Sequence, residues 1–157
     1  MNEKAYQHLA TAFVLETVAA AKNEIRARKA VSDARLKAAR FLRALTSAQR
    51  VHSNKGLMLL RGKIGSTDKN IADLMQTLEQ SVATYESILE EVEGAARRFV
   101  DQLLRTTRNH LGLLRKCNEQ DDKIYFVCQI CGFIATEKVP ENCPVCQAVK
   151  EKFLKIA

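Results

Sequence analysis

The chain has 157 residues and a formal net charge of +7, with 46% hydrophobic and 27% charged residues, a composition typical of soluble globular proteins. No stretch approaches the run of about 20 apolar residues that a membrane-spanning helix requires. The N-terminal MNEKAYQHLA also lacks the basic and apolar regions of a secretory signal. We therefore expect no membrane partner and a cytoplasmic location, where thiols stay reduced.

Scarce turn residues predict long helices over about the first 120 positions, because the whole chain has only two Pro and six Gly. The first helix is expected over about residues 3–29. The second is expected to begin near Ser32 and Asp33, which can cap it, and to run to about Lys63. Residues that recur every three or four positions lie along one face of a helix, and this stripe is expected to point inward. The stripes contain Tyr6, Leu9, Phe13, Glu16 and Ala20, then Leu42, Leu45, Gln49, His52, Gly56 and Leu59.

A glycine-containing break precedes the third helix, which Thr67 or Asp68 can cap. The third stripe contains Ile71, Leu74 or Met75, Leu78, Val82, Tyr85, Leu89 and Val92. The fourth contains Val100, Leu103, Thr107, His110 and Leu114. Only Gly94 separates these two helices. Two arrangements therefore stay open: a compact four-helix bundle, or one helix of about 50 residues from Asp68 to Cys117 in a swapped or extended dimer.

Charge is distributed in opposite blocks along the helices. Between Lys22 and Lys63 there are twelve Lys and Arg against two acids, a local net charge of +10. Between Asp68 and Glu93 there are seven acids against one Lys, a local net charge of −6. Such blocks can complement each other across a bundle or between subunits. The basic helices could alternatively bind nucleic acid or an acidic protein.

Five polar side chains occupy positions on the inward stripes of three helices. They are Glu16, Gln49, His52, Thr107 and His110. Because a buried charge is costly unless it is paired or bound to a metal, together they indicate the remnant of a site inside the bundle. Taken singly, an inward His is also explained as a hydrogen-bonded core residue, and a helical Thr can bond a preceding carbonyl.

The tail contains two Cys-x-x-Cys units, Cys128 with Cys131 and Cys143 with Cys146, separated by eleven residues. In a reducing compartment this pattern favours metal binding over disulfides. Two such knuckles bring four thiolates around one tetrahedral ion, either iron or zinc. A module of this size buries too little apolar surface to fold alone, so the metal is expected to supply much of its folding free energy. Cys117 stands apart from the pattern.

The segment VCQICGFIATEKVPENCPVCQAVKEKF resembles the C-terminal rubredoxin-like domain of rubrerythrins. The segment LATAFVLETVAAAKNEI is similar to the first ferritin-like helix of that family, in which the glutamate at the position of Glu16 is an iron ligand. The resemblance implies a mainly α chain, with a ferritin-like four-helix bundle over residues 1–120 and a rubredoxin-like metal-binding domain with four cysteine ligands over residues 121–157. In the family, a di-iron centre in the bundle reduces peroxide and the iron held by four cysteines relays electrons to it.

The chain departs from the family at the implied bundle ligands. The second helix, where the family has Glu-x-x-His, keeps His52 but carries Gln49, and the fourth keeps His110 but carries Thr107. No third-helix carboxylate falls on the core face, with Glu79 and Glu86 lying off the stripe. Neutral Gln and Thr cannot replace bridging carboxylates around two iron ions.

We therefore expect no normal di-iron peroxidase centre. Glu16, His52 and His110 could instead hold one Fe, Mn or Zn ion, or form a metal-free hydrogen-bonded cluster, and the second interpretation is favoured. The leading function is electron transfer or a redox-stress role through a four-cysteine iron centre, in a homodimer with a redox protein partner. The alternatives are a peroxide-reducing oxidoreductase with a rearranged bundle site, and a zinc-ribbon interaction or nucleic-acid-binding module.

Overall fold

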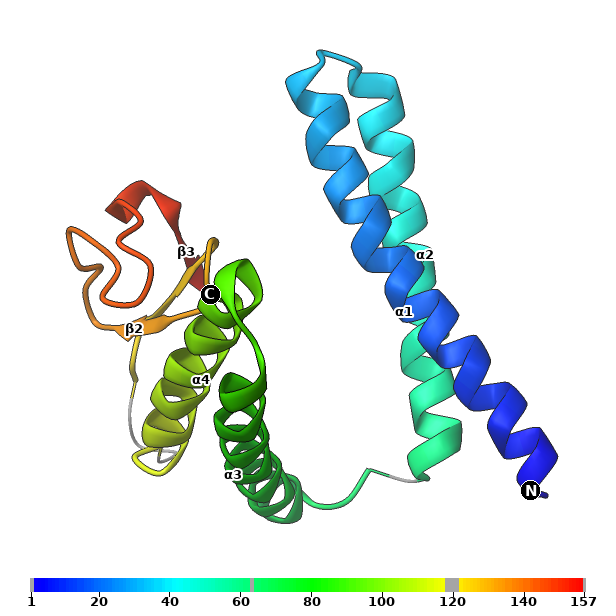
Figure 1. Ribbon diagram of the computed structural model, residues 1–157. Coiled ribbons are helices and arrows are strands. Elements are labelled where there is room, and N and C mark those ends of the chain that lie inside the picture. The colour runs from blue at the N-terminus through cyan, green and yellow to red at the C-terminus, as the bar shows by residue number, and fades with distance from the viewer. Residues whose placement is uncertain (1, 63, 118–121, 157) are drawn as a thin grey trace. The chain divides into compact units, whose positions relative to one another are not determined.

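Residues 2–62, 64–117 and 122–156 are described by a computed structural model, which divides into two units, Met1–Gly65 and Ser66–Ala157 (Figure 1). The first unit holds α1 (Glu3–Ser32) and α2 (Leu36–Arg61). The second holds α3 (Thr67–Glu91), α4 (Gly94–Leu114) and a small module of strands. The expected domain boundary between residues 120 and 121 lies outside the described residues. No helix in the described part of the chain combines the length and apolar character needed to cross a bilayer.

The helices α1 and α2 form a hairpin whose seam is built from small residues. Its buried positions are Ala20, Asn23, Ala27 and Ala30 of α1 and Ala39, Thr46, Ser53 and Gly56 of α2. At Gly56 an added Cβ would lie 3.5 Å from the Cβ of Phe13, so the two backbones pass close to each other there. Large apolar side chains such as Leu15, Ile25 and Phe41 are exposed on this unit.

The turn between α1 and α2 differs from the one expected at Ser32 and Asp33. The backbone N–H of Asp33 still bonds the carbonyl of Lys29, so α1 continues through Ser32. Ala34 then adopts a left-handed φ of 56°, and the N–H of Arg35 bonds the carbonyl of Ala30 at 2.8 Å. This pattern is a Schellman ending, so α2 begins at Leu36 without a side-chain cap.

The helices α3 and α4 are separate, and the alternative of one long helix is wrong. Val92 and Glu93 are extended, and Gly94 has a φ of 60°, so the chain reverses between the two helices. The Arg97 guanidinium donates to the carbonyl of Leu89 and satisfies a carbonyl near the end of α3. At its other end α3 is capped by Ser66, whose hydroxyl accepts from the N–H of Lys69, rather than by Thr67 or Asp68.

Part of the acidic block on α3 is neutralised within the second unit. Glu79 lies 2.7 Å from Arg115, and Glu86 bonds Arg108. Both pairs are about half exposed, so each contributes little to stability. They link the exposed faces of α3 and α4, whose buried residues on the α4 side include Val100, Leu104 and Leu111.

The C-terminal module is a three-stranded antiparallel sheet in the order β2-β1-β3. Its strands are β1 (Tyr125–Cys128), β2 (Ile134–Thr136) and β3 (Phe153–Ile156), with a short 3₁₀ turn before β3. In the register Phe126 opposes Ala135, and Cys128 opposes Phe153. The sheet therefore anchors the first cysteine at the end of its central strand, and the loops after β1 and β2 supply the other three.

Candidate metal centre

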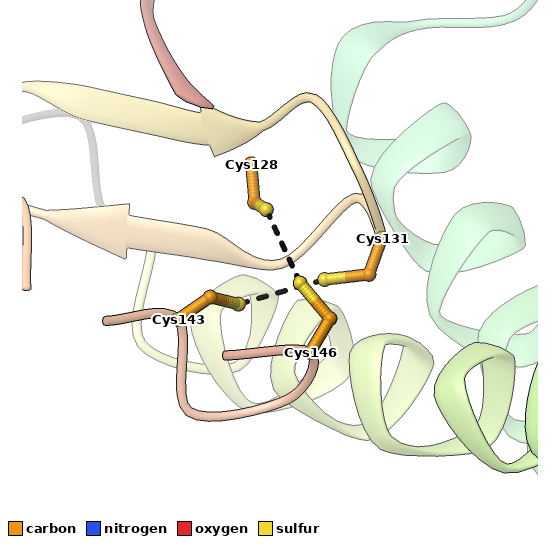
Figure 2. A group of neighbouring side chains, drawn as sticks. All are labelled: Cys128, Cys131, Cys143 and Cys146. Carbon is orange, nitrogen blue, oxygen red and sulfur yellow. Dashed lines mark hydrogen bonds between the residues drawn. The ribbon is translucent and has the colours of Figure 1, made fainter. Parts of the chain in front are cut away.

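The four cysteine sulfurs of the two knuckles lie together in the module (Figure 2). All four Sγ atoms are within 4.8 Å of one another, with 3.7 Å between Cys128 and Cys146 and 3.6 Å between Cys131 and Cys143. Cys128 and Cys143 are buried at 1% and 0% exposure, whereas Cys131 and Cys146 are half-buried. Within the described part of the chain, this is the one group of three or more Cys, His, Asp or Glu side chains arranged to hold an ion.

The sulfur geometry fits a tetrahedral metal ion. A metal–sulfur bond of about 2.3 Å places neighbouring sulfurs of a regular tetrahedron about 3.8 Å apart, close to the 3.6 and 3.7 Å found here. The same distances are far longer than a disulfide bond of about 2.05 Å, and all the cysteines are free thiols. The exposed Cys117 takes no part in the cluster.

The two knuckles have the same backbone pattern. The N–H of each leading cysteine bonds a carbonyl five residues later, Cys128 to Phe133 and Cys143 to Ala148. Each leading cysteine carbonyl in turn accepts an N–H from four residues later, from Gly132 or Gln147. These loops turn backbone N–H groups toward the sulfurs, as a thiolate site requires.

Burial and backbone N–H groups act on the pKa values of the cluster thiols in opposite directions. Burial acts to raise the pKa of Cys128, but the N–H groups of Ile130 and Cys131, with neighbouring thiols, outweigh it and hold that pKa below its usual value. Burial raises the pKa of Cys131 and of Cys146, against opposing N–H groups of Phe133 and Ala148. A bound metal would supply positive charge that favours the thiolate form of its cysteine ligands.

Gly132 directly follows the second cysteine of the first knuckle, and Gln147 directly follows that of the second. Substitutions at these two equivalent positions are expected to change stability in opposite directions. Gly132 and Gln147 have left-handed φ values of 81° and 61°. No atom lies within 4 Å of an added Cβ at Gly132, so only backbone strain opposes a side chain there. We expect Gly132→Ala to destabilise the module by about 1–2 kcal/mol and Gln147→Gly to stabilise it by about 0.5–1 kcal/mol. Denaturant unfolding of the metal-loaded chain measures both, and a loss of stability in Gln147→Gly would contradict the expectation.

The residues proposed from sequence for a bundle site are placed in different surroundings. Glu16 and His52 meet within the α1–α2 hairpin, with 3.2 Å between Oε2 and Nδ1. The His52 side chain is 61% exposed, so the expectation that it faces inward is wrong, and the Glu16 side chain is 36% exposed. Gln49 is engaged elsewhere, because its Oε1 accepts from the Nδ2 of the buried Asn23 at 2.9 Å. The structure thus brings together two members of the predicted set.

The third member, His110, belongs to the second unit and has a partner there. Its Nε2 lies 2.8 Å from the carbonyl oxygen of Gly132, in the first knuckle. A carbonyl oxygen can only accept, so this ring nitrogen carries the proton. The set of Glu16, His52 and His110 as ligands of one ion stays a prediction.

Two further residues of α4, Arg105 and Asn109, contact the metal module and carry no sequence signal for that role. Asn109 Oδ1 accepts from the N–H of Ile134 at 3.1 Å. The Arg105 guanidinium donates to the carbonyls of Pro144 at 2.6 Å and Val145 at 3.2 Å. Their four-residue spacing places them on one face of α4, but no local pattern says that this face receives the module.

Comparison with known proteins assigns the tail. Residues 126–154 match the family described as the rubredoxin-like domain of rubrerythrin. No curated protein matches the chain. The match covers the two knuckles and most of the strands.

Solved structures of nigerythrin share the fold of the chain. The structure of its mixed-valence state is 22% identical, with a TM-score of 0.51, and the match covers 96% of this chain and 86% of that one. The fully reduced, all-ferrous state and the partially reduced state are each 21% identical, with the same TM-score and the same coverage. The expected fold class is confirmed: a ferritin-like set of four helices followed by a small rubredoxin-like domain. The tail of the chain thus matches the rubredoxin-like domain of rubrerythrin, and the chain as a whole shares its fold with nigerythrin.

Proposed function

We propose that this chain is a non-haem iron protein that transfers single electrons through iron held by Cys128, Cys131, Cys143 and Cys146. The observation that carries the proposal is the sulfur cluster, whose spacing suits one tetrahedral ion. A tetrathiolate iron centre supplies a reversible one-electron couple. The similar nigerythrin structures are described in reduced, partially reduced and mixed-valence states, which favours iron over zinc.

The surface around the cluster supports exchange of electrons with a partner. Cys131 and Cys146 are half-buried, and Ile130, between the first two ligands, is 59% exposed. The second cysteine of each knuckle therefore lies near solvent, and in the first knuckle the apolar side chain of Ile130 is beside it. Small redox complexes are held by modest apolar contacts of this kind.

We propose further that the di-iron centre of rubrerythrins is lost. At the two positions where the resemblance implies Glu, the chain carries Gln49 and Thr107. Two exposed α3 carboxylates, Glu79 and Glu86, are paired with Arg115 and Arg108 of α4. Few carboxylates are then left to offset the charge of two iron ions in the bundle.

A second candidate, a peroxide-reducing oxidoreductase with a rearranged bundle site, is favoured by one observation. Glu16 and His52 lie 3.2 Å apart on facing helices, as two ligands of one ion would. The candidate requires metal that does not depend on the cysteine cluster. Metal that remained bound after the cluster was removed would support it.

The test of the proposed function is the colour and redox chemistry of protein purified without oxygen from iron-rich cells. We expect one iron per chain, a red oxidised form that bleaches when one electron is added, and full recovery on reoxidation. Zinc-loaded protein, prepared by exchange, is the matched control and should show neither change. A chain that takes only zinc under iron-rich anaerobic conditions would overturn the proposal.

A further inference from the structure

Helix α4 contacts both metal-binding knuckles through polar side chains. His110 donates to the carbonyl of Gly132 in the first knuckle, at 2.8 Å. Arg105 donates to the carbonyls of Pro144 and Val145 in the second, at 2.6 and 3.2 Å. Asn109 accepts the N–H of Ile134, directly after the first knuckle. One segment of α4, from Arg105 to His110, therefore contacts the backbone of both knuckles.

The contact of His110 reaches a cysteine sulfur through a single peptide group. The Gly132 carbonyl and the Phe133 N–H are opposite ends of the same peptide. That N–H bonds the sulfur of Cys131, where it opposes the larger effect of burial and lowers the pKa of the thiol. A donor on the carbonyl polarises the peptide and strengthens the bond made by its N–H. His110 thereby reinforces a hydrogen bond to a metal ligand without touching the ligand.

Arg105 acts on the second knuckle in the same way. The carbonyls of Pro144 and Val145 share their peptides with the N–H groups of Val145 and Cys146. These are the second and third residues after Cys143. In the first knuckle the N–H groups at the corresponding positions, Ile130 and Cys131, bond the sulfur of Cys128. The positive charge of Arg105 thus lies on the two peptides whose N–H groups correspond to the sulfur donors of the first knuckle.

We propose that His110 and Arg105 are positioning residues that raise the reduction potential of iron held by the four cysteines. The proposal rests on the proposed function of that centre. Reduction transfers one electron from an external one-electron donor to ferric iron and takes the tetrathiolate complex from one negative charge to two. Hydrogen-bond donors and positive charge near the sulfurs stabilise the more negative form. Their removal therefore favours the oxidised state.

The test is the midpoint potential of the full iron-loaded chain, titrated with dithionite and mediators. For His110→Leu we expect the reduced form to lose stability relative to the oxidised form by on the order of tenfold, a fall of about 59 mV for one electron. His110→Gln keeps an N–H donor on a side chain of similar reach and should restore most of the potential. Arg105→Met should give a smaller fall, because its side chain is 45% exposed and partly screened by solvent.

The matched control for Arg105 is Arg108→Met. Arg108 lies on the same helix and carries the same charge, but it bonds Glu86 and not a knuckle. Its loss should leave the potential nearly unchanged. Equal shifts in the Arg105 and Arg108 variants would assign the effect to overall charge and would overturn the role of Arg105.

A second measurement separates this inference from the proposed function. In zinc-loaded protein, hydrogen exchange at the Phe133 amide should be faster in His110→Leu than in His110→Gln, since a weaker N–H bond to sulfur protects less. A wild-type chain that never cycles iron would overturn the proposed function, and this proposal with it. A chain that cycles iron with the same midpoint in wild type, His110→Leu and Arg105→Met would overturn this proposal alone.

Discussion

Replacing Cys128 and Cys143 together with serine is expected to abolish metal binding in the tail and to unfold the C-terminal module. These two side chains are the most buried of the cluster, and each belongs to a different knuckle. Structural zinc sites contribute about 10–16 kcal/mol of apparent binding free energy, which for a small module is its folding free energy. The strands β1, β2 and β3 should then lose amide protection while the helical circular dichroism signal largely persists.

The matched control is Cys117→Ser, which removes an exposed thiol outside the cluster. It should retain full metal content and an intact sheet. Metal analysis of the double serine variant also decides between the two expectations for the bundle. One metal per wild-type chain and none in the variant means that Glu16, His52 and His110 hold no ion. Iron or manganese remaining in the variant would show a second site and would contradict the proposed loss of bundle metal.

The spacing of the cysteines predicts their convergence because knuckle geometry is local. Each Cys-x-x-Cys unit requires only a tight turn, and Gly132 signals the left-handed residue that ends the first one. The equivalent residue of the second knuckle is Gln147, which gives no such signal although its φ is also left-handed. A search for glycine after the second cysteine therefore predicts the left-handed turn of the first knuckle but not the equivalent turn of the second.

The inward stripes of α1 and α2 were only partly predicted, because hydrophobic periodicity favours large residues. The expected stripe through Leu42, Leu45 and Gln49 lies beside the true seam at Ala39, Thr46 and Ser53. Small residues bury little apolar area, so they carry little weight in such a pattern. They nevertheless decide which faces meet, since only small side chains let two helices approach closely.

The contacts of α4 with the metal module could not be read from sequence. His110 is placed correctly on the helix by its spacing, but its partner is the Gly132 carbonyl, a backbone atom 22 residues away. Backbone acceptors carry no sequence signature. The resemblance to rubrerythrins implies a metal-ligand role for His110 and says nothing of Arg105 or Asn109.

Replacing Ala27 with leucine is expected to destabilise the α1–α2 hairpin severely. Ala27 is 2% exposed in the seam between α1 and α2, and leucine would add three carbons there. Overpacking of this kind costs about 1–3 kcal/mol. The strain falls one helical turn from Asn23, whose buried amide bonds Gln49 at 2.9 Å. If the helices separate enough to break that bond, an unsatisfied amide adds about 1–3 kcal/mol more.

The control is Ala21→Leu, the same substitution on the same helix at an exposed position. It leaves the seam unchanged and should shift stability by less than about 0.5 kcal/mol. Urea unfolding followed by circular dichroism measures both variants in the metal-loaded chain. Equal stability of the two variants would mean that the seam tolerates a large side chain, and that close approach of the α1 and α2 backbones does not hold the hairpin together. A loss confined to Ala27→Leu would show that the small residues specify the pairing of α1 with α2.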